Sequence, residues 1–439
     1  MPSSRRLALP RSTGPAPTFP WRRARCSSSS PRNAWPPSRR KARGNPVTTL
    51  SKGPVGTLFF IVFIDLVGFG VVIPLLPYYA LEFHATPFEV TTMMACYSLA
   101  QFFASPLLGH LSDRLGRRPV ILASLVCSVV SYLWLGFATQ LWMLFAARLL
   151  AGAGAGNISA AQAYVADVTP PDQRAKGMGM IGAAIGLGFT LGPAIGGAVA
   201  GGDAQSAHLA WPAFVAAALS AAAFVLAFTR LEESLTNHPA SAPVGRLAMA
   251  KAATMRPTLR LLLLLVFVSI AAFAGMETTF ALWAHDGFGW GPFQVGMIFF
   301  YVGILLSALQ GGAIGKLAKA LGETKLVIAG ASILAVGLLA LTFAHALWWV
   351  LVACALLAIG MGMFSPSMAS LFSQQAREGE RGGVLGLSQS AQSLARIVGP
   401  AVAGALYGGF GRNAPYYLGA LLMAGVVWFA LQLPRPERR

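Results

Sequence analysis

Residues 109–120 read GHLSDRLGRRPV and place four charged side chains between two long apolar runs. Each flanking run is close to the ~20 residues that an α-helix needs to cross a bilayer. Arginines in a short loop between two membrane helices favour the cytoplasmic side of the membrane. The stretch therefore predicts a polytopic membrane protein with this loop in the cytoplasm.

The composition of the whole chain agrees with this prediction. Of its 439 residues, 55% are hydrophobic and only 11% are charged, whereas soluble proteins have about a quarter charged. Apolar runs between charged, proline or glycine breaks predict an all-α protein with twelve transmembrane helices. Their expected centres are Asp65, Tyr97, Cys127, Gly154, Phe189, Leu219, Ala272, Leu305, Leu334, Leu357, Arg396 and Leu422. No room is left for a large soluble domain.

The basic residues are distributed unevenly among the predicted loops. Alternate loops, together with the two ends of the chain, hold 30 of the 33 lysines and arginines. The exceptions are Arg148, Arg396 and Arg412. Because basic residues are retained on the cytoplasmic side, both termini are expected in the cytoplasm.

Residues 1–52 form a basic N-terminal extension. They hold twelve lysines and arginines and no acid, so they supply most of the net charge of +18. The extension has no periodic apolar residues and is predicted to be disordered. It is either a basic arm near anionic lipid headgroups or sequence translated upstream of a later start, in which case residues 1–46 are not native. A charge confined to such a tail does not indicate a nucleic-acid partner.

Three sequence markers recur at nearly one spacing. They are TPFEV (86–90) and GPFQV (291–295), GHLSDRLG (109–116) and GKLAKALG (315–322), and GPAIGG (192–197) and GPAVAG (399–404). Offsets of 205 to 207 residues predict two six-helix halves in parallel repeat. In transporters this arrangement places the binding site between the halves near the bilayer midplane.

The repeat also predicts the domain boundaries. We expect six-helix bundles over 53–231 and 258–433 and a cytoplasmic C-terminal tail over 434–439. The longest basic loop, 232–257, contains three prolines as helix breakers and is expected to be a cytoplasmic linker between the bundles.

Four ionisable residues fall inside predicted spans: Asp65, Arg148, Glu277 and Arg396. Charges in a bilayer are costly and usually functional. A carboxylate that moves between a desolvated environment and one beside an arginine can take up and release a proton. These residues are predicted to couple transport to protons, the alternative being a static buried ion pair such as Asp65 with an arginine.

Taken together, the motifs resemble the major facilitator superfamily over residues 55–433, which implies that superfamily's fold. GHLSDRLGRRPV is similar to its signature loop, in which charges hold the cytoplasmic side closed in one state. Asp113 is expected to accept hydrogen bonds from backbone N–H groups at a neighbouring helix N-terminus, while Arg117 and Arg118 clamp carboxylates such as Asp167. The gating residues implied are Gly109, Asp113, Arg114, Gly116, Arg117, Arg118 and Asp167.

A second motif, GLGFTLGPAIGG at 186–197, has glycines at every fourth position. Such a stripe lets another helix approach closely, and a proline adds a local kink. The pattern resembles the antiporter signature of the drug/proton branch of the superfamily, which implies efflux rather than uptake. The signature positions are Gly188, Gly192, Pro193, Gly196 and Gly197.

Two further stretches are similar to tetracycline efflux antiporters: DLVGFGVVIPLLP (65–77) and GMETTFALWAHDGFGWGP (275–292). The resemblance implies proton-coupled efflux of amphipathic small molecules, tetracycline-like drugs first among them, by rocking of two bundles in a bacterial inner membrane. The expected partners are the substrate, protons and the lipid bilayer, with no obligate protein partner. The proton gradient would supply the energy, with no cofactor and no metal.

Polar or aromatic residues on otherwise apolar helices are candidates to face the substrate cavity. They are Tyr97, Gln101, Gln162, Phe280, Gln310, Gln389 and Gln392. Each could instead hydrogen-bond a neighbouring helix.

Two other functions compete with efflux. An uptake symporter for a small metabolite shares the expected fold but not the glycine stripe at 188–197. A membrane enzyme would need a clustered catalytic constellation, whereas the embedded acids and bases are dispersed singly over four helices. No phosphate-binding loop of an ATP-driven pump occurs. The sequence therefore favours a secondary transporter.

Overall fold

The computed structural model describes residues 53–170, 173–202, 208–235, 256–376 and 381–432. Within these ranges every regular element is a helix. The predicted N-terminal extension, the predicted C-terminal tail and most of the predicted linker lie outside the described residues.

The helices form twelve consecutive crossing segments. The first six are α1 (Pro54–Val72) with α2 (Leu76–Glu82), α3 (Pro87–Leu115), α4 (Arg117–Gly136), α5 (Leu141–Ala153) with α6 (Asn157–Val168), α7 (Arg174–Ala200) and α8 (Ala210–Arg230). The other six are α10 (Pro257–Phe288), α11 (Pro292–Ala308) with η1 (Leu309–Ala313) and α12 (Ile314–Leu321), α13 (Glu323–Thr342), α14 (Leu347–Gln375), α15 (Arg381–Phe410) and α16 (Ala414–Ala430). Each contains one predicted centre, which confirms the twelve-helix prediction.

Nine of these segments, among the described residues, are long and apolar enough to cross a membrane. The remaining three are α3, α15 and the shorter apolar α16. α3 and α15 are long, but both carry charged and amide side chains along their length. Polar residues in a crossing helix face the interior of a bundle or a water-filled space. α3 and α15 are therefore the helices in which to look for functional groups.

Three crossings are interrupted, each at a residue that disfavours an α-helix. Pro74, which lacks a backbone N–H, lies in the turn between α1 and α2. Gly154–Gly156 forms the turn between α5 and α6, because glycine has a low helix propensity. Gly311 and Gly312 lie in η1, a π-helical turn between α11 and α12. The break between α5 and α6 gives the fourth crossing a new helix start in its middle.

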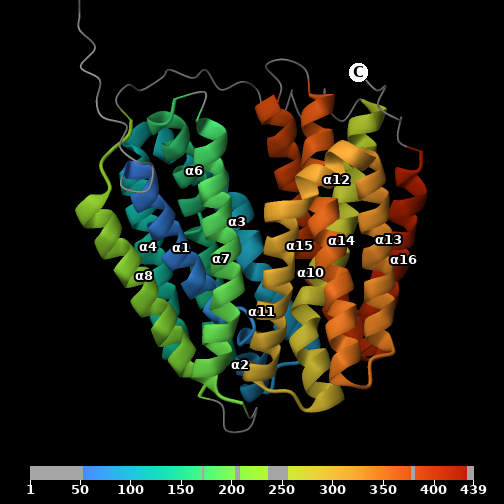
Figure 1. The fold of residues 1–439 in the computed structure, drawn as a ribbon. Coiled ribbons are helices and arrows are strands. Elements are labelled where there is room, and N and C mark those ends of the chain that lie inside the picture. The colour runs from blue at the N-terminus through green and yellow to red at the C-terminus, as the bar shows by residue number, and fades with distance from the viewer. Residues whose placement is uncertain (1–52, 171–172, 203–207, 236–255, 377–380, 433–439) are drawn as a thin grey trace, which may run out of the picture. The chain divides into compact units, whose positions relative to one another are not determined.

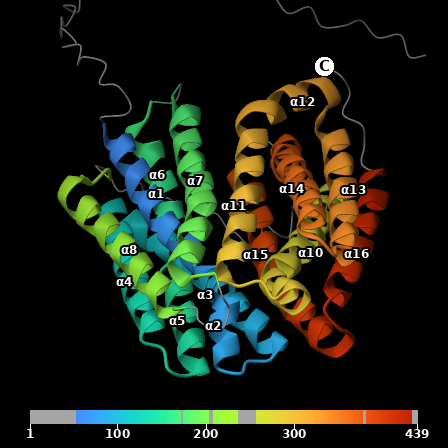
Figure 2. The same cartoon turned by 60° about the horizontal axis from the view of Figure 1, so that its bottom comes forward.

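The helices gather into two bundles, α1 to α8 and α10 to α16, as Figure 1 shows. The bundles meet mainly where α7 packs against α11 and α3 packs against α15, and Figure 2 shows α7 and α11 side by side. These two pairs are related by the sequence repeat. We call the end of the bundles that carries the α3–α4 turn the α3–α4 end, and the opposite end the α2 end.

Candidate functional site

The turn between α3 and α4 is a single residue, Gly116. Its φ of +106° is one that residues with a side chain rarely adopt. A Cβ added there would collide with the carboxylate of Glu233. That carboxylate accepts hydrogen bonds from the backbone N–H groups of Arg117 (2.8 Å) and Arg118 (3.1 Å), the first two residues of α4. Glu233 therefore caps the N-terminus of α4, where a negative charge is favoured.

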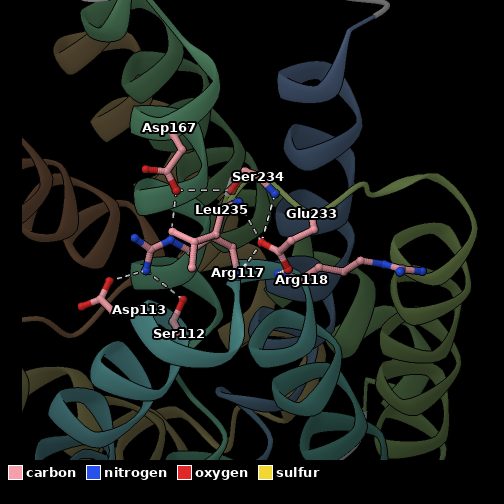
Figure 3. Close-up of polar contacts among 8 residues, drawn as sticks. All are labelled: Ser112, Asp113, Arg117, Arg118, Asp167, Glu233, Ser234 and Leu235. Atoms are coloured by element: carbon pink, nitrogen blue, oxygen red, sulfur yellow. Dashed lines mark hydrogen bonds and ion pairs between the residues drawn. The ribbon is translucent and has the colours of Figure 1, made fainter. Parts of the chain in front are cut away.

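Beside this cap, the guanidinium of Arg117 lies between the carboxylates of Asp113 and Asp167 (Figure 3). It forms ion pairs with Asp113 (2.5 Å) and Asp167 (3.0 Å) and donates to Ser112 Oγ (3.2 Å). Asp167 comes from α6 and also accepts from Ser234 Oγ at 3.3 Å. The predicted clamp between Arg117 and Asp167 is present, and it ties α4 to α6 and to the chain after α8.

The prediction that Asp113 accepts from a helix N-terminus is wrong for this structure. The acceptor at the start of α4 is Glu233, and Asp113 instead pairs with Arg117 one turn along the chain while staying half exposed. The predicted clamp by Arg118 is also absent: its guanidinium donates to the Phe228 carbonyl at 2.8 Å and lies over the Phe228 ring. Arg114 is exposed. The α3–α4 network therefore lies within the first bundle.

Replacing Glu233 by Gln removes the charge that caps α4. Loss of a helix cap costs about 1 kcal/mol, which predicts an apparent melting midpoint in detergent lower by about 1–2 °C. Glu232→Gln is the matched control, because its exposed side chain makes no hydrogen bond among the described residues. Equal midpoints for the two variants would show that Glu233 does not support α4.

Asp65 lies in the middle of α1 and is buried. One carboxylate oxygen accepts from Ser220 Oγ at 2.9 Å, and the other accepts from the side-chain amide of Asn157. The amide of Asn157 is held in this orientation because its oxygen accepts the backbone N–H of Ile158 at 2.7 Å. The break between α5 and α6 therefore delivers a fixed donor to Asp65.

The alternative of a static ion pair between Asp65 and an arginine is not what the structure contains. No ion pair joins Asp65 to an arginine among the described residues. Arg148 is buried and lies 4.5 Å from the ring centroid of Tyr97 and 5.8 Å from that of Phe69, with its Nε unpartnered. Arg148 therefore contacts aromatic faces and leaves Asp65 to neutral donors.

A narrow cavity adjoins Asp65. Its lining includes polar and aromatic side chains from the first four crossings: Asp65, Phe69, Tyr97, Ser128, Tyr132 and Asn157. The predicted candidates Asp65 and Tyr97 thus lie together in the first bundle. Ser128, Tyr132 and Asn157 were not predicted as site residues, although Asn157 ends the stretch RLLAGAGAGN that Arg148 opens.

The other two embedded charges lie in the second bundle. Glu277 on α10 is partly buried, and Arg396 on α15 is exposed. The charge of Arg396 acts on Glu277 without a direct ion pair, and it also acts on Tyr97 across the junction of the bundles. The four predicted residues are therefore divided between the bundles without direct ion pairs: Asp65 and Arg148 lie in the first bundle, and Glu277 and Arg396 in the second.

The glycine stripe of α7 packs against α1. An added Cβ at Gly188 would lie 2.7 Å from Leu66 Cβ, and one at Gly192 would lie 2.6 Å from Gly70 Cα. One at Gly196 would collide with the carbonyl oxygen of Val71. The predicted close approach of a helix to this stripe is therefore present.

Gly197, the last signature position, contacts the other bundle. A Cβ there would lie 2.8 Å from the Pro292 carbonyl oxygen at the start of α11. Gly404, its counterpart in the repeat, faces the start of α3, where an added Cβ would lie 3.0 Å from the Pro87 carbonyl oxygen. The repeated markers GPAIGG/GPAVAG and TPFEV/GPFQV thus contact one another crosswise, and these two equivalent contacts join the bundles at the α2 end.

Towards the α3–α4 end the same helices separate. Several glycines on them have no atom within 4 Å of an added Cβ: Gly109 on α3, Gly179 and Gly182 on α7, Gly311 and Gly312 in η1, and Gly386 on α15. Thr190 Oγ1 and Ser307 Oγ are still 3.5 Å apart across the junction. The structure is therefore closed at the α2 end and opens towards the α3–α4 end.

The predicted cavity residues lie at different depths. Gln310, Gln389 and Gln162 are exposed, whereas Gln101 and Gln392 are partly buried, and Gln392 donates to Ser388 on its own helix. Exposed amides on the separating helices face water more favourably than lipid. Gln310 and Gln389, which lie on helices of the junction, are therefore consistent with a water-filled space between the bundles, whereas Gln162 lies on α6 within the first bundle.

Phe280 was predicted to face the cavity, and this is wrong. It is 2% exposed, with its ring 5.9 Å from that of Trp283 and 5.7 Å from that of Phe299. α10 is buried on most of its circumference between Gly275 and Ala284, so the pattern of apolar residues along it does not indicate which face lines a cavity.

Comparisons with known proteins agree with this architecture. Residues 58–322 and 307–439 match the Major Facilitator Superfamily. Tetracycline resistance protein, class B, of Escherichia coli is 30% identical over 377 residues, covering 84% of this chain and 92% of that protein. Multidrug resistance protein 2 of Bacillus subtilis (strain 168) is 30% identical over 365 residues, covering 80% and 89%.

Solved structures show the same fold. The human organic anion transporter MFSD10 (TETRAN) superposes with a TM-score of 0.66 at 25% identity, covering 86% of this chain and 98% of that one. The nucleoside transporter NupG superposes with a TM-score of 0.72 at 12% identity, covering 87% and 99%. The chain belongs to the major facilitator superfamily, as an integral membrane protein that transports a small molecule and is not an enzyme.

Proposed function

We propose that the protein exports amphipathic small molecules in exchange for protons, by alternating access between two conformations. Tetracycline-like drugs are the first substrate class to test, because relatives named for tetracycline and multidrug resistance align over most of the chain. Energy comes from the proton gradient, with no bound cofactor. The α3–α4 end and both termini face the cytoplasm of a bacterium, in its inner membrane.

The observation that carries this proposal is the environment of Asp65. A buried carboxylate without a cationic partner is a group that a small structural change can protonate. Its two donors come from different helices, since Asn157 lies at the start of α6 and Ser220 on α8. Movement of α1 relative to either helix would remove a donor and favour proton uptake. The conformational change and the proton would then be linked.

Transport in everted membrane vesicles tests the function. Respiring vesicles that contain the protein should accumulate a fluorescent tetracycline, and an uncoupler should abolish the accumulation. Substrate addition should also release protons from the vesicle lumen. Uptake symport, the competing function, predicts uncoupler-sensitive accumulation in whole cells and none in everted vesicles, and that outcome would overturn efflux.

Glu277→Gln is expected to impair coupling without abolishing binding. The substitution keeps the shape of the side chain but removes a carboxylate on which the charge of Arg396 acts. We expect the substrate-triggered proton release in vesicles to fall about 10-fold, as for loss of a charge-assisted interaction. Glu82→Gln, an exposed acid at the end of α2, is the control. Unchanged proton release in Glu277→Gln would assign Glu277 a structural role.

A further inference from the structure

Arg396 supplies a positive charge at the junction of the bundles. Arg396 is exposed on α15, at the level where α3 and α15 begin to separate, and it makes no hydrogen bond or ion pair among the described residues. Gly404, about two turns nearer the α2 end, is packed against the start of α3 in the other bundle, whereas Gly386 nearer the α3–α4 end has no atom within 4 Å of an added Cβ. Arg396 therefore lies at the floor of the space between the bundles.

The nearby acids do not neutralise this charge for an incoming molecule. Asp65 is 4% exposed, and both of its oxygens already accept hydrogen bonds. Glu277 is partly buried and forms no direct ion pair with Arg396. Arg148 is likewise buried, against the ring of Tyr97, so the charge that an incoming molecule meets is that of Arg396. An anion is thus favoured over a cation at this position.

An aromatic wall faces the same space from the first bundle. The ring of Phe69 lies 5.0 Å from Tyr97 and 5.6 Å from Phe189, which joins side chains of α1, α3 and α7. Phe189 is 38% exposed, so part of its ring can contact another flat molecule. Gly404 on α15 contacts Pro87 and Thr91 on α3, so these two helices face each other across the junction. Arg396 and Tyr97 each lie about two turns from this contact towards the α3–α4 end, so the wall and the cation lie at a similar level of the junction.

We propose that Arg396 and the aromatic wall of Phe69, Tyr97 and Phe189 form a recognition site for amphipathic organic anions: flat, largely apolar molecules that carry one acidic group. The acidic group accepts from the guanidinium of Arg396, and the ring system packs on the wall. This inference rests on the proposed transport function and specifies its substrate class. It excludes organic cations as the preferred substrates.

The preference is tested by equilibrium binding, with two dyes that share a xanthene ring and differ in charge. Fluorescein is anionic at neutral pH, and tetramethylrhodamine ethyl ester is cationic. Fluorescence anisotropy with the purified protein in an uncharged detergent is expected to show tighter binding of fluorescein. Tighter binding of the cationic dye would overturn the proposal.

Variants assign the preference to the site. Arg396→Gln should weaken fluorescein binding about 10- to 100-fold, as for loss of a charge-assisted hydrogen bond, and Arg396→Lys should restore part of it. Arg412→Gln, a neutralised arginine beyond the end of α15, is the control and should bind as the wild type. Unchanged fluorescein affinity in Arg396→Gln would overturn the proposal.

A second variant keeps Arg396 in place, in case its removal prevents folding. Gln392→Glu puts a carboxylate one turn away on the same helix face, where it can pair with Arg396. Fluorescein binding should weaken while binding of the cationic dye strengthens, and the absence of both changes would contradict the site. Phe189→Ala should weaken both dyes equally, since ring packing does not depend on charge.

These binding experiments use no proton gradient, so they fail or succeed independently of the proposed function. Preferred binding of the cationic dye together with uncoupler-sensitive efflux would refute the anion site and leave proton-driven export intact. Preferred binding of the anion without uncoupler-sensitive transport would refute proton-driven export and leave the recognition site intact.

Discussion

Asp65→Asn is expected to reduce proton-driven efflux to the level of vesicles that lack the protein, while substrate binding stays within a few-fold of the wild type. The asparagine has nearly the same shape but cannot take up a proton. The donors of Asn157 and Ser220 can still reach its amide oxygen, so the fold of the first bundle should persist. A loss confined to coupling is the expected result.

Two measurements on the same variant test this prediction. Substrate-triggered proton release in vesicles reports coupling, and equilibrium binding in detergent reports the fold and the site. Asp286→Asn is the matched control. Asp286 is an exposed acid that does not line the cavity, and its carboxylate accepts a hydrogen bond of 2.7 Å from the hydroxyl of Tyr407. Full proton-coupled efflux by Asp65→Asn would remove Asp65 from the mechanism, and the coupling group would then have to be sought at Glu277.

Gly404→Val is expected to shift the protein away from the conformation described here. The added side chain would meet Thr91 Oγ1 and the backbone of Pro87 and Phe88, and backbone atoms cannot move aside by a rotamer change. Overpacking of this kind costs about 1–3 kcal/mol. Since the cost applies only while the α2 end is closed, the ratio of the two conformations should change by about 10- to 100-fold. Transport should fall accordingly.

The shift can be measured as a distance between two spin labels. Leu111 on α3 and Leu385 on α15 are exposed near the separated ends of these helices, and the label-to-label distance should shorten in Gly404→Val. Gly408→Val, one turn further along α15, is the control because nothing lies within 4 Å of a Cβ there. An unchanged distance distribution in a well-folded Gly404→Val protein would show that this contact does not hold the α2 end closed.

The twelve crossings, the repeat and the close packing of the α7 stripe could all be predicted from the sequence. Each depends on a signal that is local or periodic along the chain. An apolar run of sufficient length predicts a crossing, and glycines at 188, 192 and 196 lie on one helix face by spacing alone. The partner of that face, α1, could not be predicted, because it is set by tertiary packing.

Glu233 is a residue whose role depends on tertiary contacts and could not be predicted from the sequence. By composition it belongs to a charged linker, and its carboxylate is 116 residues away in sequence from the backbone N–H that it caps. No pattern along the chain connects the two. Asp113 was the expected acceptor at the N-terminus of α4 because it lies beside the turn. It is four residues before Arg117, however, and its carboxylate pairs with the Arg117 guanidinium instead.

Asn157 was missed for a different reason. It follows a run of small residues that reads as part of a continuous apolar span. The break at Gly154–Gly156 turns this position into the first residue of a new helix, and only that change brings its amide to Asp65. Propensity indicates that the glycines weaken the helix, but it does not say whether the neighbouring helices make up for the loss.

The crosswise contacts of Gly197 with Pro292 and of Gly404 with Pro87 and Thr91 involve glycines and mainly backbone atoms. The groups between the bundles that can meet a cargo, by contrast, are side chains of other positions, such as Phe189 and Arg396. Mutations that change the substrate preference can therefore accumulate without disturbing the contacts that close the α2 end. Proteins built in this way can acquire new substrates during evolution while the contacts used in the conformational change stay the same.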